Sequence, residues 1–195
     1  MMSKVKYSLF ILVLLISTTF VAYPQCRNVR SASLKNRIYP LKSLVFTQNK
    51  TKWLRVSNGL YEDKNVLTND SFLYFRIVDI AFGDLAGDGK EEAAVSAVYR
   101  HTNSSFHLTD YYIFGCVAGK TKLIGILKQD RIEEDSGMDL QESLEDPLKI
   151  KNGVLYVTHG TEGNRPSPEF TTTFRYKIVK DKLVPYKRPL RRKNY

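Results

Sequence analysis

The feature that most constrains this chain is the stretch from Ile77 to Tyr99, where two apolar segments flank a short loop rich in acidic residues and glycine. The loop, residues 83–92, holds four acidic side chains and three glycines. Aspartate and glycine favour tight turns, and β-branched and aromatic residues favour strands. The pattern therefore predicts a strand, an acidic turn and a second strand.

The spacing of oxygen-bearing residues in this loop is similar to that of a calcium-binding loop. Counted from Asp84, positions five and nine are Asp88 and Glu92, and position seven offers the main-chain carbonyl of Lys90. Calcium takes about six to eight oxygen ligands, and glycine at position six permits a sharp turn. Position three is Ala86, which brings no side-chain oxygen. Two interpretations stay open: a structural calcium site weakened by Ala86, or a polar turn chosen for its geometry alone.

This loop resembles the FG-GAP or integrin-type calcium loop, D-x-[DN]-x-D-G-x-x-[DE]. More closely, residues 83–93 resemble the GDLxGDGxEEA core of a group of short secreted bacterial proteins of unknown function. In that group the core follows segments similar to Tyr39-Pro40 and residues 56–62 here. The resemblance covers residues 39–186. It implies a β-rich fold and a calcium-type loop, and it implies no particular activity.

The first 22 residues have the organisation of a secretory signal peptide. Lys4 and Lys6 precede an unbroken apolar run from Leu9 to Ile16, and Ala22 offers a cleavage site. This run is shorter than the roughly 20 residues that span a bilayer, so cleavage is favoured over an uncleaved anchor. We therefore expect a secreted or extracytoplasmic protein without a transmembrane helix after cleavage.

Short β-prone segments separated by turn signals fill the rest of the chain. Such a pattern predicts a mainly β fold, an antiparallel meander of hairpins forming a sandwich or a partly open barrel. Hairpin turns are expected at residues 57–59, 118–120, 151–153 and 180–182, with Trp53 in the core. No helix is expected after the signal peptide, and residues 128–147 are the longest expected irregular segment. The expected organisation is a signal peptide (1–22), an extended lead-in (23–40), one β-rich domain (41–186) and a basic tail (187–195).

Two cysteines, Cys26 and Cys116, favour a disulfide in an oxidising compartment. The formal net charge of +10, lowered by two when Lys4 and Lys6 leave with the signal peptide, favours an anionic macromolecule or an envelope surface as partner. Nucleic acid is disfavoured because the basic residues are scattered and the chain is exported. The basic tail is interpreted either as an anchor to an anionic surface or as a disordered, solubilising terminus.

No catalytic motif is present in the sequence. The histidines, His101, His107 and His159, match no metal-ligand spacing, and neither cysteine lies in a nucleophile motif. The first hypothesis is therefore a secreted, non-enzymatic β-rich binding module, in which calcium at the acidic loop clamps two strands if it binds. The alternative is a secreted hydrolase of cell-wall polymer or glycan, with paired carboxylates from residues 84–92 or 130–146 as acid and base.

Overall fold

The computed structural model describes residue 29 and residues 31–41, 51–62, 73–101, 107–141, 147–164 and 167–194. This part of the chain is mainly β and its strands are antiparallel, which confirms the predicted fold class. None of its helices is long and apolar enough to cross a membrane. The predicted signal peptide and Cys26 lie outside the described residues, so both stay predictions.

The central sheet contains five strands in the order β3-β4-β5-β6-β7. Each strand pairs with its neighbour in sequence, and the shortest connection is the two-residue turn between β6 and β7. The predicted hairpin around the acidic loop is the β4–β5 pair, in which Gly83 lies opposite Glu92. The strands are β3 (Leu60–Glu62), β4 (Leu73–Gly83), β5 (Glu92–His101), β6 (Leu108–Val117) and β7 (Lys120–Leu127).

The C-terminal sheet has the order β11-β10-β9-β8, and β12 pairs with β10 beyond the end of β11. The predicted turns at residues 151–153 and 180–182 connect β8 to β9 and β10 to β11. The strands are β8 (Lys149–Lys151), β9 (Val154–Asn164), β10 (Ser167–Val179), β11 (Lys182–Pro185) and β12 (Leu190–Lys193).

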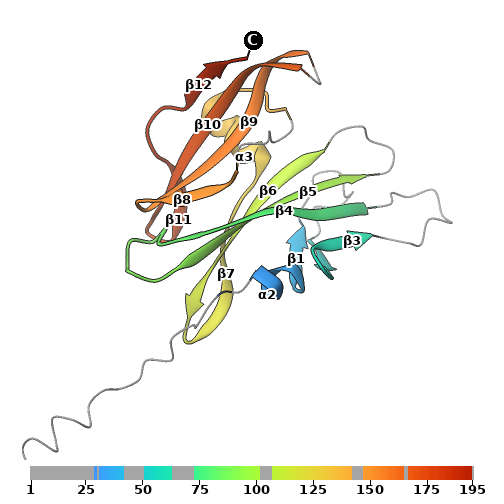
Figure 1. Cartoon of the computed structure of the whole chain (residues 1–195), viewed down its shortest axis with the longest axis vertical. Coiled ribbons are helices and arrows are strands. Elements are labelled where there is room, and N and C mark those ends of the chain that lie inside the picture. Colours follow the sequence, from blue (N-terminus) through green and yellow to red (C-terminus); the bar gives the residue numbers. More distant parts are fainter. Residues whose placement is uncertain are drawn as a thin grey trace, which may run out of the picture.

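The central sheet is covered on both faces, by the N-terminal elements on one side and the C-terminal sheet on the other (Figure 1). Helix α2 (Ser31–Lys35) and the N-terminal ribbon, β1 (Ile38–Leu41) paired with β2 (Lys52–Arg55), build the first core around Tyr39 and Phe75. The second core joins Tyr111 and Ile113 to Phe174 and Tyr176. The segment 31–40, expected as an extended lead-in, is thus part of the domain.

The hairpin predicted at residues 57–59 is wrong in its pairing. Strand β2 pairs with β1 and strand β3 pairs with β4, so only an isolated bridge joins Ser57 to Leu60. Leu54 is buried in the first core, and the alternation of side chains turns Trp53 outward, where it is 67% exposed. The expectation that Trp53 is a core residue is therefore wrong as well.

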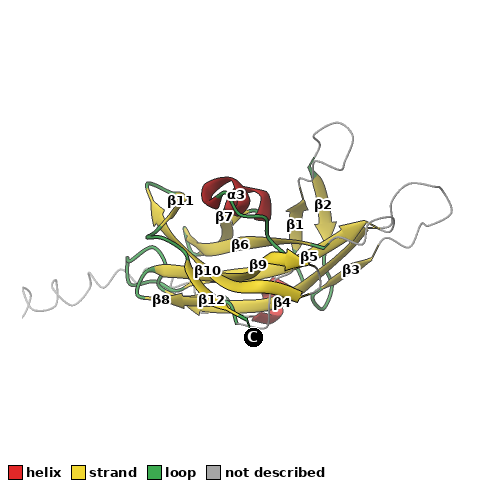
Figure 2. Cartoon of the chain, turned by 90° about the horizontal axis from the view of Figure 1, so that it is seen from above, coloured by secondary structure: helices red, strands yellow, loops and turns green. Residues whose placement is uncertain are grey.

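Two further elements differ from expectation. Helix α3 (Gln129–Ser136) occupies part of the segment expected to be irregular, and it lies beside β6 in both views (Figure 1, Figure 2). Ile132 is the one apolar residue of this helix and is buried. A single apolar residue gives no helical periodicity in the sequence. Residues 190–193 of the basic tail form β12 on β10, so the disordered interpretation is wrong for these residues.

Candidate functional site

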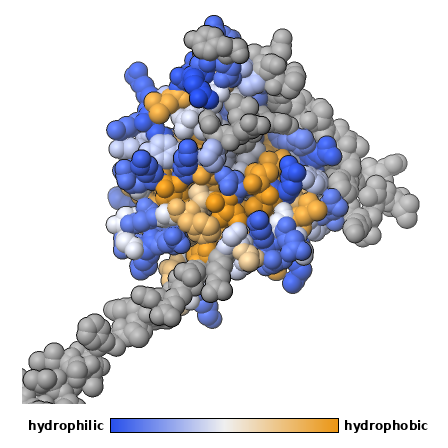
Figure 3. All heavy atoms as spheres, in the orientation of Figure 1, coloured by the Kyte–Doolittle hydropathy of each residue, from blue (hydrophilic) through white to orange (hydrophobic). Residues whose placement is uncertain are grey.

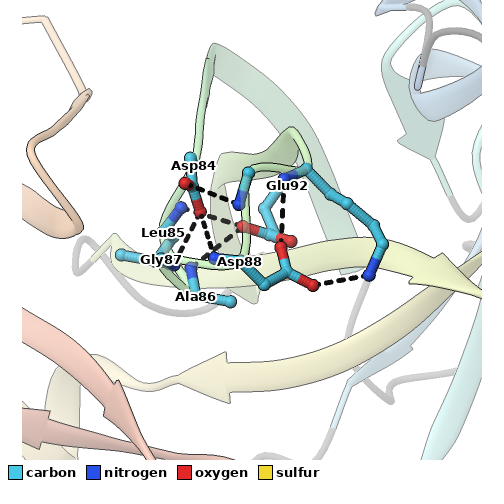
Figure 4. A network of polar contacts seen from close by, with 8 residues as sticks. Asp84, Leu85, Ala86, Gly87, Asp88 and Glu92 are labelled. Carbon is cyan, nitrogen blue, oxygen red and sulfur yellow. Dashed lines mark hydrogen bonds and ion pairs between the residues drawn. The ribbon is translucent and has the colours of Figure 1, made fainter.

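The acidic loop between β4 and β5 is closed by its own main-chain amides (Figure 4). Asp84 Oδ1 accepts hydrogen bonds from Gly87 N at 2.6 Å and Asp88 N at 3.1 Å, and its Oδ2 accepts one from Gly89 N at 2.9 Å. Gly87 and Gly89 have φ of 74° and 77°, a conformation that glycine adopts without strain. The sequence thus folds the loop around the Asp84 carboxylate.

Glu92 closes the other side of the loop. Its Oε2 accepts hydrogen bonds from Leu85 N at 2.8 Å and Ala86 N at 3.0 Å, and the residue is only 4% exposed. Burial raises the pKa of the Glu92 carboxyl, and the two amide hydrogen bonds oppose that rise. Glu92 therefore holds the start of the loop against the start of β5.

Asp88 lies on the outside of the loop and pairs with Lys90. The Lys90 ammonium is 2.6 Å from Asp88 Oδ2, and Lys90 N donates to Asp88 Oδ1 at 3.0 Å. The hydrogen bond from the Lys90 side chain is the largest cause that lowers the pKa of Asp88. A lysine ammonium thus supplies the positive charge beside this carboxylate.

These contacts fit a calcium ion poorly. Calcium needs about six to eight oxygens that converge on one point. Asp84 Oδ1 and Glu92 Oε2 each already accept hydrogen bonds from two main-chain amides. The Lys90 ammonium is bound to Asp88 Oδ2, and the Ala86 side chain has no oxygen. Within the described residues, no group of three or more His, Cys, Asp or Glu side chains is arranged to hold a metal ion.

The start of the loop is packed against the C-terminal sheet, whereas residues 86–91 are exposed. Leu85 is buried in the second core, and a Cβ added at Gly83 would lie 2.8 Å from Ile150 Cγ2 on β8. Asp79 Oδ2, on β4, accepts a hydrogen bond at 2.8 Å from Leu148 N, just before β8. The acidic loop and the strand before it therefore join the central sheet to the C-terminal sheet.

Two carboxylates of α3, candidates for the acid and base of a hydrolase, are also engaged by protein groups, whereas Asp130 and Glu134 are exposed. Asp135 Oδ1 lies 2.8 Å from Arg131 Nε, and its Oδ2 accepts a 3.4 Å hydrogen bond from the Tyr176 hydroxyl. Glu133 Oε1 accepts from Gln129 Nε2 at 3.1 Å and from Leu140 N at 3.3 Å. Residues 142–146 lie outside the described residues.

Sequence reasoning did not single out His159, the most buried titratable group of the second core. Its Nδ1 lies 3.1 Å from the Gln141 carbonyl oxygen, which can only accept, so Nδ1 carries the proton. Nε2 of the neutral ring then accepts from the Tyr111 hydroxyl at 2.8 Å. Burial lowers the pKa of His159 to about 4. The position of His159 on the apolar face of an alternating strand was the available signal.

Asp110 was also missed, although it is the only charged residue in the apolar run of β6. Its Oδ1 accepts a 3.3 Å hydrogen bond from Gln129 N, the first residue of α3. Lys128, at the N-cap of α3, provides no side-chain cap, so Asp110 supplies an acceptor from a distant strand. Burial raises the pKa of Asp110 to about 7. Both buried groups lie within the fold and serve its packing.

The remaining predicted site residues are not brought together. His107 is half-buried just before β6, and the side chain of His101 lies outside the described residues, so a site shared with the acidic loop stays untested. Cys116 is half-buried near the end of β6, and the predicted disulfide with Cys26 stays a prediction. Comparison with protein-family models, with characterised proteins and with solved structures finds no match for this chain.

Proposed function

We propose that the protein is an exported, non-catalytic β-rich binding module, in which the acidic loop is a structural joint between the two large sheets. The signal-peptide pattern supports export, and the surplus of basic residues supports an anionic macromolecule or envelope surface as partner. The joint keeps the two sheets in fixed positions, so that their surfaces are available for binding.

One observation carries the non-catalytic proposal: two of the loop carboxylates, those of Asp84 and Glu92, point at the loop itself. Asp84 and Glu92 accept hydrogen bonds from five main-chain amides, those of residues 85–89. A general acid or base must reach an incoming substrate, and glycoside cleavage needs two carboxyl groups that face each other across it. Carboxylates that hold a turn closed serve stability instead.

Calcium is the alternative way to stabilise the loop. An ion at this place would have to displace the Lys90 ammonium from Asp88 and compete with the amides at Asp84. We therefore propose that the loop is stable without an ion, the turn-geometry interpretation of the sequence.

The test combines an activity assay with a calcium titration of the mature chain. Incubation with purified cell wall and with soluble glycans should release no fragments. The melting temperature should be the same in 1 mM calcium as in 1 mM magnesium. Fragment release that Glu92→Gln abolishes would overturn the non-catalytic proposal. A calcium-specific rise in melting temperature that Asp88→Ala abolishes would overturn the ion-free joint.

A further inference from the structure

The outer face of the C-terminal sheet, the side turned away from the second core, is strongly basic. Phe174 and Tyr176 of β10 pack into the core, so the alternating residues Arg175 and Lys177 lie on the opposite face. Residues paired across neighbouring strands lie on the same face of a sheet. Three further cations lie on this face because they pair with outer residues of β9 and β10: Lys149, Lys151 and Lys182. None of these five side chains forms an ion pair with a carboxylate of the described residues.

Protection of sheet edges explains only part of this charge. Lysine on an edge strand discourages pairing with another chain, which accounts for lysines on β8 and β11. Arg175 and Lys177 lie on β10, which is paired with β9 on one side and with β11 and β12 on the other. Two cations in the middle of a sheet face therefore need another explanation.

Four of these cations form two files with an uncharged strip between them. Lys149 and Lys151 follow β8, Arg175 and Lys177 follow β10, and β9 runs between these strands. Residues 149–160 and 171–179 contain no acidic residue. With strands about 4.8 Å apart, the two files are separated by roughly 10 Å.

Aromatic rings lie among these cations. The register places Tyr156 on the strip opposite both Lys149 and Arg175. Lys177 Nζ lies 4.1 Å from the centre of the Tyr186 ring, which holds the ammonium group on this face. The strip therefore offers a hydroxyl-bearing ring flanked by positive charges on both sides.

We propose that the outer face of the C-terminal sheet binds a linear, phosphate-bearing polyanion, which lies along β9 and is contacted by the cations of β8 and β10. This inference rests on the proposed binding function and names its surface and its class of partner. A linear chain suits the strip because Lys149 and Arg175 flank it at Tyr156, and Lys151 and Lys177 lie two residues further along their own strands. Binding releases counterions from the polymer and so weakens steeply with salt.

An anionic bilayer is the competing partner, and the distribution of apolar side chains disfavours it. Peripheral membrane surfaces combine cations with inserted aromatic or aliphatic side chains. Among the described residues the most exposed large apolar side chain is that of Trp53, on the N-terminal ribbon across the central sheet, and the outer face of the C-terminal sheet carries no exposed tryptophan or phenylalanine but two aliphatic side chains, Leu190 and Val179. In Figure 3 the hydrophobic surface gathers in the middle of the view, below the part occupied by β9, β10 and β12 in Figure 1.

The experiment measures binding of the mature chain to long-chain inorganic polyphosphate over a series of salt concentrations. Lys149→Gln with Lys177→Gln removes one cation from each file. The control, Lys120→Gln with Lys122→Gln, removes the same charge from exposed positions on β7. Should the first double variant melt early, Lys149→Gln with Lys151→Gln, at two exposed positions on an edge strand, replaces it.

The proposal expects the first double variant to bind at least tenfold more weakly and the control less than twofold. The slope of log K against log salt should become shallower by roughly 0.7 per cation removed. Equal weakening in both variants, or no binding of polyphosphate by the wild type, would overturn the proposal. Binding to phosphatidylglycerol vesicles without binding to polyphosphate would also overturn the proposal. Shortening of the polyphosphate chain would overturn the non-catalytic function while leaving the binding face in place.

Discussion

The Tyr111 hydroxyl on β6 donates a hydrogen bond to His159 Nε2 on β9 at 2.8 Å, and this buried contact links the two large sheets. The two rings meet edge to face, with centroids 5.9 Å apart. Because the second nitrogen of the imidazole donates to the Gln141 carbonyl, both ring nitrogens are satisfied only while the ring is neutral and in this tautomer. The linkage between the sheets is therefore sensitive to acid.

Acid should weaken the fold through His159. Burial lowers its pKa from 6.5 to about 4, so the folded state takes up this proton less readily than the unfolded chain. The contribution of His159 to the free energy of unfolding is complete above pH 6.5 and is lost as the pH falls from 6.5 through 4, by roughly 3 kcal/mol. Urea unfolding at stepped pH should show this loss, and His159→Gln, which cannot titrate, should remove it. An unchanged pH profile in the variant would contradict the assignment.

Asp110 should act in the opposite direction. Burial raises its pKa from 3.8 to about 7, so the fold favours the protonated carboxyl. Its contribution is complete below pH 3.8 and is lost as the pH rises through 7. Asp110→Asn keeps an acceptor for Gln129 N and cannot ionise, so the variant should be more stable than the wild type at pH 8, by roughly 1 to 4 kcal/mol. Equal stability at pH 8 would show that Asp110 ionises at no cost.

Local patterns made most of the large sheets predictable. The turns after Val117, Lys151 and Val179 each contain two residues with positive φ, and glycine or aspartate in the second position of each turn is typical of tight hairpins. The acidic loop was predicted for the same reason, since Gly87 and Gly89 supply the positive φ that closes it. What lies within a few residues of a turn was therefore predictable from sequence.

Strand pairings and contacts that depend on residues distant in the sequence were not predictable. Val56 N donates to the Arg37 carbonyl and Gly59 N to the Lys35 carbonyl, so a segment some 20 residues earlier replaces the local hairpin. Helix α3 depends on Asp110 for its N-terminal acceptor, and the one local signal for it is Gly137, which ends the helix at φ 68°. The network of His159 likewise needs three separate segments to meet. Such contacts form only in the assembled fold.

The Asp84 carboxylate should contribute more to stability than its neighbour Asp88. Asp84→Ala leaves the amides of Gly87, Asp88 and Gly89 without their acceptor, which should cost about 1 to 3 kcal/mol in urea unfolding. Asp88→Ala removes an exposed ion pair with Lys90 and should leave the midpoint unchanged within error. Faster hydrogen exchange at Gly87 and Gly89 should accompany the first change alone. Equal effects of the two variants would contradict the joint.

Trp53 should report on the surface of the folded protein. It is the single tryptophan of the chain and is 67% exposed on β2. Because water already surrounds most of the indole, its emission should resemble that of free tryptophan and shift little when urea unfolds the chain. Acrylamide should quench it almost as efficiently before unfolding as after. A blue-shifted, protected emission would instead place Trp53 in a core or an interface.

A methyl group at Gly83 should separate the two sheets. A Cβ at this position would lie 2.8 Å from Ile150 Cγ2 and 3.1 Å from the Ile150 carbonyl oxygen, closer than van der Waals contact allows. Gly83→Ala should therefore destabilise the fold by about 1 to 3 kcal/mol, as overpacking does. The control is Gly125→Ala on β7, where the nearest atoms are 3.6 Å away and no shift is needed.

The cost of Gly83→Ala should also depend on its neighbour. In an Ile150→Ala background the Cγ2 atom is gone, so the same methyl group should cost less, and a double-mutant cycle in urea unfolding measures the difference. Additive effects would mean that β4 and β8 do not meet at this point. In that case the joint between the central and C-terminal sheets would lose one of its three attachments, and only buried Leu85 and the hydrogen bond from Leu148 to Asp79 would remain.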